Sequence, residues 1–194
     1  MTLQEQETRL RAALRPAPLA FVSDAAQPLK AASVLIPMVG HEEGFSVLLT
    51  QRTSHLRHHP GQISFPGGGV EAGDRSPMHT ALRETREEIG LAPERVEVIG
   101  YLPDYCTVTG FCITPVVGIV TPPFELRPDA EEVAEIFEVP LSFLLDPANH
   151  REQAIVYAGE LRSFHAVPYQ GYNIWGATAG MIVSLYQALS AQAQ

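Results

Sequence analysis

The chain has 194 residues, of which 45% are hydrophobic and 18% are charged. This composition excludes a disordered chain and is typical of one globular domain with a sizeable core. The formal net charge of −9 argues against a nucleic-acid polymer as the main partner, because binding to a phosphate backbone needs a basic surface.

No targeting signal or membrane span is evident in the sequence. No apolar run approaches the roughly 20 residues that cross a bilayer, and the polar N-terminus lacks the apolar core of a secretory signal. We therefore expect a cytoplasmic protein without a membrane partner. The two cysteines, Cys106 and Cys112, are too few for a structural zinc site, and nothing in the sequence suggests that they pair.

Strands and helices follow one another without a regular βαβ rhythm. We expect an N-terminal helix and a proline-containing lead-in over residues 1–30, and a C-terminal helix within residues 170–194. Further helices are predicted at residues 77–89 and just after Pro140. The predicted strands span residues 31–39, 45–51, 63–65, 94–102, 111–120, 135–139, 153–158 and 161–167. This pattern predicts the α/β class, with a mixed sheet flanked by helices in a single domain over residues 1–194.

The clearest of these helices spans residues 77–89. Ser76 is expected to cap its first turn, and Gly90 is expected to end it in the left-handed conformation. Successive residues of a helix are rotated by about 100°, which places the apolar side chains on one stripe. The residues expected in this buried stripe are Met78, Ala81, Leu82, Thr85 and Ile89.

Three glutamates, Glu84, Glu87 and Glu88, border this stripe. The plain interpretation is a solvated acidic face. The alternative is a metal site, since carboxylates on a rigid element suit Mg²⁺ or Mn²⁺, with water and substrate phosphate completing the coordination shell. The glycine-rich loop that leads into the helix favours the metal site. Arg83, one turn from Glu87, would orient the carboxylates.

The loop over residues 52–75 is rich in glycine and histidine, and a loop of this length is usually functional. Arg52 and Arg57 can form charge-assisted hydrogen bonds to phosphate, and Gly67 and Gly68 let backbone N–H groups approach a ligand closely. A pyrophosphate is therefore the expected ligand. For each histidine of the loop taken singly, ordinary loop polarity is the simpler interpretation; these are His55, His58 and His59.

Residues 68–91 resemble the box of the Nudix family, in which a glycine, five residues and a glutamate precede an Arg-Glu-x-x-Glu-Glu-x-Gly core. The core is present from Arg83 to Gly90. Asp74 replaces the first glutamate, and one extra residue precedes the core. The resemblance implies the Nudix fold, an α/β/α sandwich around a mixed sheet with a loop–helix–loop.

The segment before the box resembles the signature of coenzyme A pyrophosphatases within this family. That signature runs Leu-Leu-Thr-x-Arg-Ser, three residues, Arg, three residues, Gly, three residues, Phe-Pro-Gly-Gly. Residues 48–68 match it in register, with Arg52, Arg57 and Gly61 at the corresponding places and Thr53 in place of serine.

The resemblance implies that Glu84 and Glu88 ligate the metal, and that Glu87 joins them or holds a bridging water. The function expected from it is metal-dependent hydrolysis of the diphosphate of coenzyme A or its derivatives to 3′,5′-ADP and 4′-phosphopantetheine. The cofactor would be Mg²⁺ or Mn²⁺ and the partner a small-molecule substrate, with a homodimer left open. The alternatives are another substrate (NADH, ADP-ribose or a nucleoside triphosphate), a nucleotide-binding module without activity, and an isoprenoid diphosphate isomerase with a catalytic cysteine.

Residues 129–138 are acidic, and hydrolysis needs a group that takes a proton from water. Glu132 and Glu135 are therefore candidates for the general base or an additional metal ligand, against the simpler interpretation of a solvated acidic loop. Tyr172 and Trp175 are candidates for stacking on an adenine, although ordinary core or surface packing is the simpler interpretation.

Overall fold

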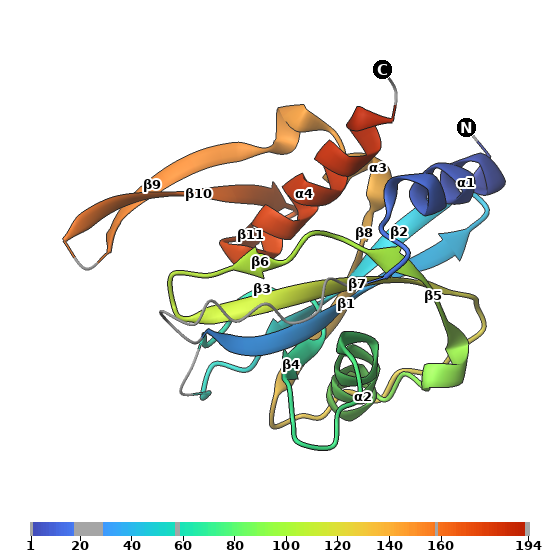
Figure 1. Cartoon of the computed structure of the whole chain (residues 1–194), viewed down its shortest axis with the longest axis horizontal. Coiled ribbons are helices and arrows are strands. Elements are labelled where there is room, and N and C mark those ends of the chain that lie inside the picture. The colour runs from blue at the N-terminus through green and yellow to red at the C-terminus, as the bar shows by residue number, and fades with distance from the viewer. Residues whose placement is uncertain (1, 18–28, 57–58, 158, 193–194) are drawn as a thin grey trace.

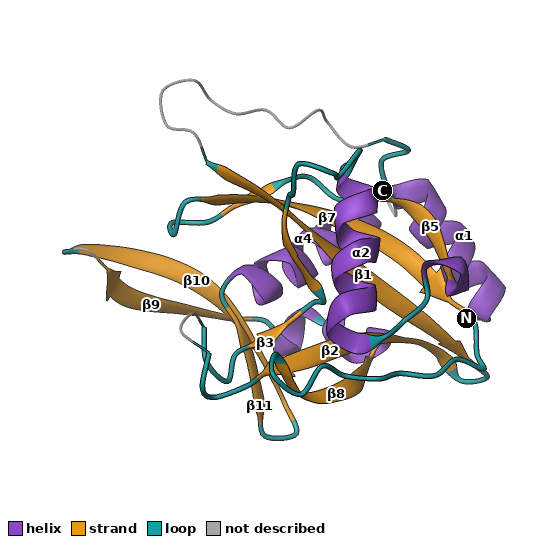
Figure 2. Ribbon diagram, turned by 90° about the horizontal axis from the view of Figure 1, so that it is seen from below, coloured by secondary structure: helices purple, strands orange, loops and turns teal. Residues whose placement is uncertain are grey.

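A mixed β-sheet forms the centre of the protein, and helices cover both of its faces (Figure 1, Figure 2). A computed structural model describes residues 2–17, 29–56, 59–157 and 159–192. The strands of the central sheet are, in chain order, β1 (Lys30–His41), β2 (Gly44–Arg52), β3 (Ile63–Ser64), β4 (Gly67–Gly69), β5 (Val96–Tyr101), β6 (Tyr105–Cys106), β7 (Phe111–Val120) and β8 (Val133–Pro140).

β1 lies in the middle of this sheet because it pairs with three other strands. It runs parallel to β7 and antiparallel to β2 and β4. β3 and β8 pair with β2, while β5 and β6 pair with β7. The sheet is therefore mixed, as the sequence predicts.

A second, antiparallel sheet follows near the C-terminus, and its strands are β9 (Arg151–Tyr157), β10 (Glu160–Tyr169) and β11 (Tyr172–Trp175). Figure 1 shows β9 and β10 as a long ribbon that extends away from the central sheet. The α-helices are α1 (Leu3–Ala13), α2 (Pro77–Ile89), α3 (Leu141–Leu144) and α4 (Ala177–Ala191), and two 3₁₀ turns, η1 (Pro93–Arg95) and η2 (Pro147–Asn149), join neighbouring elements.

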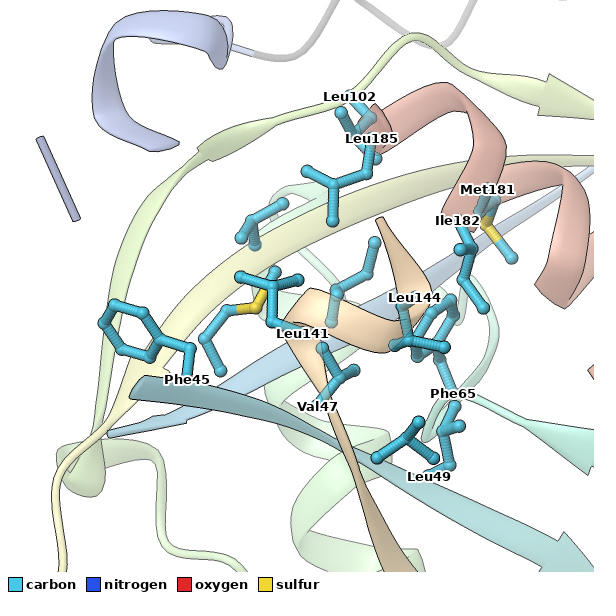
Figure 3. Close-up of a cluster of buried hydrophobic side chains, with 14 of the residues drawn as sticks. Phe45, Val47, Leu49, Phe65, Leu102, Leu141, Leu144, Met181, Ile182 and Leu185 are labelled. Atoms are coloured by element: carbon cyan, nitrogen blue, oxygen red, sulfur yellow. The ribbon is translucent and has the colours of Figure 1, made fainter. Parts of the chain in front are cut away.

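The alternation of side chains along β1 divides the core between the two faces of the sheet. Leu35 and Val39 belong to the clusters that pack against α2. Ile36 and Met38 belong to the larger cluster on the other face, which includes side chains from α1, α3 and α4. Figure 3 shows the centre of that larger cluster, which includes Phe65 from the loop before β4 and Ile182 from α4.

The predicted helix over residues 77–89 is confirmed with the same bounds. The fold class is confirmed as α/β. The short strands β4, β6 and β11 were not expected, because two to four residues carry too little alternation to show in a sequence. The prediction was wrong for one residue of the apolar stripe: Met78, in the first turn of α2, is 38% exposed. Within the described residues, no helix is both long and apolar enough to cross a membrane.

Both predicted caps of α2 are present. The Ser76 side chain accepts a hydrogen bond from the His79 N–H, and Gly90 ends the helix in the left-handed conformation with φ 70°. A Cβ atom at Gly90 would lie 2.9 Å from the Cβ of Arg127. The chain leaves the helix at Gly90. Residues 127–129 lie against this end of the helix, where the Arg127 N–H donates to the Ile89 carbonyl.

Gly90→Ala is expected to lower the free energy of unfolding by about 1–2 kcal/mol, because alanine is strained in the left-handed region. Gly73→Ala is the matched control, since a Cβ there meets nothing within 4 Å. Urea unfolding of both variants measures the difference. Equal stability of the two variants would contradict a conformational role for Gly90.

Candidate active site

Helix α2 and strand β4 face each other across the candidate active site. The backbone of Gly68 lies so close to Glu84 that a Cβ atom at this glycine would stand 2.5 Å from the Glu84 Cδ. Gly68 is paired with Ser33 of β1, so the sheet holds it in this position. Only glycine permits this approach of the backbone to the carboxylate.

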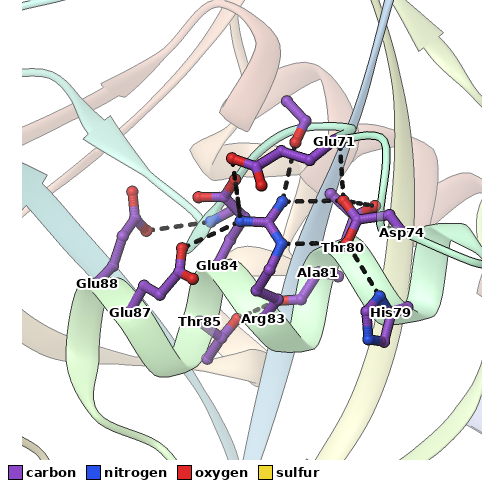
Figure 4. Close-up of polar contacts among 12 residues, drawn as sticks. Glu71, Asp74, His79, Thr80, Ala81, Arg83, Glu84, Thr85, Glu87 and Glu88 are labelled. Carbon is purple, nitrogen blue, oxygen red and sulfur yellow. Dashed lines mark hydrogen bonds and ion pairs between the residues drawn. The ribbon is translucent and has the colours of Figure 1, made fainter.

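Arg83 is the centre of an ion-pair network that joins α2 to the loop before it (Figure 4). Its Nε and Nη2 donate to the two carboxylate oxygens of Asp74 at 3.1 and 2.9 Å. Its Nη1 donates to Glu84 Oε1 and to Glu87 Oε2, each at 3.0 Å, and its Nη2 also donates to the Gly69 carbonyl at 3.1 Å. Arg83 thus contacts two of the three glutamates and the loop in front of them.

Asp74 is the buried anchor of this network, with its side chain only 2% exposed. It accepts hydrogen bonds from the Glu71 N–H and the Thr80 hydroxyl and contacts the His79 ring. The Arg83 guanidinium, helped by these neighbours, holds the pKa of Asp74 well below its ordinary value despite burial, and Asp74 in turn raises the pKa of Arg83. Asp74 is shorter than the glutamate of the Nudix box, and one extra residue precedes the Arg83–Gly90 core. The Asp74 carboxylate nevertheless contacts Arg83.

Glu88 is the most buried of the three glutamates, with its side chain 5% exposed. The Gly67 N–H donates to its Oε2 at 3.1 Å, and the Arg52 Nη1 lies 3.5 Å from its Oε1. Burial raises the pKa of Glu88 to about 7, the negative charges of Glu132 and Glu84 add to the rise, and Gly67 and Arg52 oppose it. The positive charge near Glu88 does not fully compensate the negative charge of its carboxylate. A bound cation would compensate it.

Glu84 and Glu87 differ from Glu88 in their exposure. The Glu84 side chain is 18% exposed, and burial raises its pKa against the opposing effect of Arg83. The Glu87 side chain is 60% exposed. The helix therefore presents one carboxylate in the interior, one at its border and one toward solvent.

Thr53 connects the basic loop to the acidic segment near residue 132. Its hydroxyl donates to the Glu131 carbonyl at 2.9 Å, and its N–H donates to the Glu132 carbonyl at 2.9 Å. These bonds hold Glu132 near the site, where its charge raises the pKa of both Glu84 and Glu88. In the sequence, Thr53 is notable only because it replaces the serine of the signature. Its bonds to Glu131 and Glu132 join segments more than 70 residues apart in the chain.

Glu135 is not brought to this group. The next residue, Ile136, packs with the cluster on the α2 face, whereas Phe137 packs with the cluster on the opposite face. Glu135 shares the face of Phe137, and the Tyr172 hydroxyl donates to its carboxylate at 2.7 Å. Strand β8 therefore separates Glu135 from the α2 carboxylates.

The other candidate residues have more ordinary surroundings. Tyr172 stacks on Phe137 with ring centroids 3.9 Å apart, and Trp175 packs edge-on against Phe164 at 5.5 Å. The predicted substrate residue Arg57 and its neighbour at position 58 lie outside the described residues.

The oxygen donors of α2 determine which metal the site could hold. Among the residues that the structure describes, no group of three or more His, Cys, Asp or Glu side chains is arranged as a metal site. Mg²⁺, however, is commonly held by one or two carboxylates together with water and substrate phosphate. Glu84 and Glu88 are such a pair, and Gly68 leaves the space beside Glu84 free of a side chain. Hard oxygen donors of this kind fit Mg²⁺ or Mn²⁺.

Carboxylates that can hold a divalent cation beside arginine side chains suit the hydrolysis of phosphoanhydride bonds. The chain matches the family model of the NUDIX domain over residues 29–158. The chain therefore belongs to the Nudix family.

Individual relatives agree with this assignment. The chain is 47% identical over 154 residues to the uncharacterized Nudix hydrolase NudL of Enterobacter sp. (strain 638), covering 79% of this chain and 80% of that protein. Two solved structures share the fold. The Nudix hydrolase RenU of M. smegmatis has a TM-score of 0.51 at 24% identity and covers 60% of this chain and 74% of its own. The C. elegans Ap4A hydrolase has a TM-score of 0.51 at 15% identity and covers 86% of this chain and 99% of its own.

The predictions of a Nudix fold and of a hydrolase acting on phosphoanhydride bonds are thus confirmed. Nudix hydrolases generally need a divalent metal ion and act on small nucleotide derivatives.

Gly68→Ala is expected to reduce divalent-metal affinity and turnover at least about tenfold, because the new methyl group displaces the Glu84 carboxylate. Gly69→Ala is the matched control on the same strand, since a Cβ there meets nothing within 4 Å. Isothermal titration with Mn²⁺ and chromatography of the hydrolysis products measure the two effects. Equal loss in both variants would show that the close approach to Glu84 is unimportant.

The raised pKa of Glu88 predicts a pH-dependent stability in the absence of metal. The folded chain binds this proton more tightly than the unfolded chain, so wild-type stability falls as the pH rises from the ordinary value of 4.5 to about 7. Glu88→Gln removes this penalty and is expected to be more stable than wild type at pH 8, by up to about 3 kcal/mol. The difference should shrink as the pH falls and vanish below the unfolded pKa of 4.5, toward pH 4. Urea unfolding in EDTA measures it, with the exposed Glu87→Gln as control, and a pH-independent difference would contradict the assignment.

Proposed function

We propose that the protein is a pyrophosphohydrolase that cleaves the diphosphate of coenzyme A or a derivative of it, with Mg²⁺ or Mn²⁺ as the cofactor. The observation that carries the proposal is the position of Glu84 and Glu88 beside Arg52 and the Gly67–Gly68 backbone. The match of residues 48–68 to the coenzyme A pyrophosphatase signature supports the choice of substrate. The proposal includes a cytoplasmic location and no nucleic-acid partner, in keeping with the net charge of −9.

Glu84 and Glu88 would hold the metal in this proposal, with Glu87 next to them on the solvent side. A bound divalent cation polarises phosphate oxygens and favours ionisation of water. Arg83 acts indirectly, because its bonds to Asp74, Glu84 and Glu87 fix the directions of the carboxylates. Its role is to position the ligands.

Arg52 and Arg57 would bind the pyrophosphate. Arg52 lies at the end of β2, and its side chain is 24% exposed, so the guanidinium can contact both Glu88 and an entering phosphate. Charge-assisted hydrogen bonds from arginine to phosphate oxygens are strong and directional. Gly67 and Gly68 supply the backbone surface beside which the diphosphate would lie.

Glu132 is the best placed candidate for the general base. Its carboxylate is near enough to Glu84 and Glu88 to raise the pKa of both, and the side chain is exposed to solvent. It would accept a proton from the water that attacks one phosphorus. The P–O–P bond then breaks to give 3′,5′-ADP and 4′-phosphopantetheine.

Two alternatives are separated by experiment. The first is the same chemistry on NADH, ADP-ribose or a nucleoside triphosphate, and the second is nucleotide binding without cleavage. Glu88 is buried and Glu84 lies at the border of the interior. Carboxylates in such positions weaken the fold without a cation, so their presence favours a metal-dependent catalytic site over binding alone.

A product assay compares coenzyme A, NADH, ADP-ribose and dATP with Mg²⁺ or Mn²⁺, using chromatography to identify the products. Coenzyme A is expected to be cleaved with the highest kcat/KM and to give 3′,5′-ADP. Preference for another nucleotide would overturn the substrate while retaining the site. Absence of cleavage of all four would favour the binding module.

Substitutions of Glu132 and Glu135, three residues apart, test the assignment of the general base. Glu132→Gln is expected to lower kcat about 10²–10⁴-fold, the usual contribution of a general base. Glu135→Gln, on the opposite face of the sheet, is the matched control and should stay within about twofold of wild type. Steady-state kinetics on the best substrate of the product assay decide between them. The reverse order of effects would exclude Glu132 as the base.

A further inference from the structure

The two cysteines face each other across the hairpin formed by β6 and β7. Cys106 is paired directly with Cys112, and their Sγ atoms are 2.8 Å apart. The Thr107 N–H donates to the Phe111 carbonyl at 2.8 Å, so these neighbours form a hydrogen-bonded pair. Because the two kinds of pair alternate in an antiparallel ladder, the cysteines occupy a non-hydrogen-bonded pair, in which side chains lie closer together.

This position suits a disulfide bond. The Cα atoms of such a pair lie about 4.5 Å apart, within the range of about 4.4–6.8 Å found in disulfides. A sulfur–sulfur bond is about 2.05 Å long, so the two sulfurs need to approach by less than about 1 Å. Both thiols are free, and the sequence contains no third cysteine that could compete.

The core holds the hairpin in place from the other side of the sheet. Tyr105, next to Cys106, packs into the large apolar cluster. Its ring lies over Gly180 of α4, where a Cβ atom would collide with it. Successive side chains of a strand point to opposite faces, so the burial of Tyr105 directs Cys106 to the α2 face, where Cys112 also lies.

We propose that Cys106 and Cys112 form a reversible thiol–disulfide site that reacts with small disulfides such as oxidised glutathione. The Cys106 thiolate attacks one sulfur of the small disulfide, whose S–S bond breaks and releases one thiolate. The Cys112 thiolate then attacks the Cys106 sulfur and displaces the second small thiolate. Two protein thiols are thereby oxidised, one small disulfide is reduced to two thiols, and the two protein protons pass to the released thiolates. This site is independent of the proposed substrate.

The surroundings of the two sulfurs determine the order of these steps. Cys106 is exposed, whereas Cys112 is partly buried. Burial raises the pKa of Cys112 to about 12, helped by the hydrogen bond and charge of Cys106 and by the charge of Asp104. Cys106 is therefore the thiol that reacts first. Its conversion to a mixed disulfide removes its own hydrogen bond and charge, which favours the subsequent attack by Cys112.

The experiment treats the native full-length chain with oxidised glutathione and records its intact mass and its reactive thiols. We expect wild type to lose two hydrogens in mass and both reactive thiols, without a glutathione adduct, and dithiothreitol should restore both. Cys112→Ser is expected to stop at one glutathione adduct on Cys106. Cys106→Ser is expected to react much more slowly. Circular dichroism shows that the variants are folded.

Three outcomes would overturn the proposal. A stable glutathione adduct on wild type would mean that Cys112 does not complete the exchange. A covalent dimer would mean that the cysteines pair between chains. Unchanged thiols in wild type, under conditions that modify an unfolded sample, would mean that the hairpin does not admit a small disulfide.

Discussion

The bidentate pair between Arg83 and Asp74 is the contact on which the rest of the candidate site depends. It ties the loop after β4 to the first two turns of α2, and the same guanidinium binds the Gly69 carbonyl. Because the pair is bidentate and the Asp74 side chain is 2% exposed, its geometry is fixed more firmly than that of an isolated surface ion pair. With Arg83 held in this way, its remaining N–H groups orient Glu84 and Glu87. Loss of the pair would release the loop and both carboxylates together.

The burial of Glu88 is the opposite kind of feature, one that costs stability. Its carboxylate lies against the Gly67 N–H with Arg52 only at 3.5 Å, and the nearby charges of Glu84 and Glu132 are of the same sign. Such an arrangement opposes ionisation at neutral pH, while a divalent cation reverses the effect. A cation bound at Glu88 would therefore also stabilise the fold.

The two faces of the sheet separate residues that are adjacent in sequence. Glu132 lies on the side of α2, held by the backbone bonds of Thr53, whereas Glu135 is bound by Tyr172 on the other side. The same alternation along β6 buries Tyr105 and brings Cys106 opposite Cys112. In both places, a shift by one residue in strand register would exchange the inward and outward side chains.

The sequence by itself determined the local features. Apolar periodicity and capping residues placed α2 at residues 77–89 and its glutamates on one arc, because helix geometry depends on neighbouring residues only. The family box in turn indicated the fold. The tertiary structure decided the rest: which acid of residues 129–138 lies near α2, that Asp74 still contacts Arg83, that Gly68 lies against Glu84, and that Cys106 lies opposite Cys112. These contacts join separate elements, and they depend on strand register and on the packing of helix against sheet, which a local pattern does not encode.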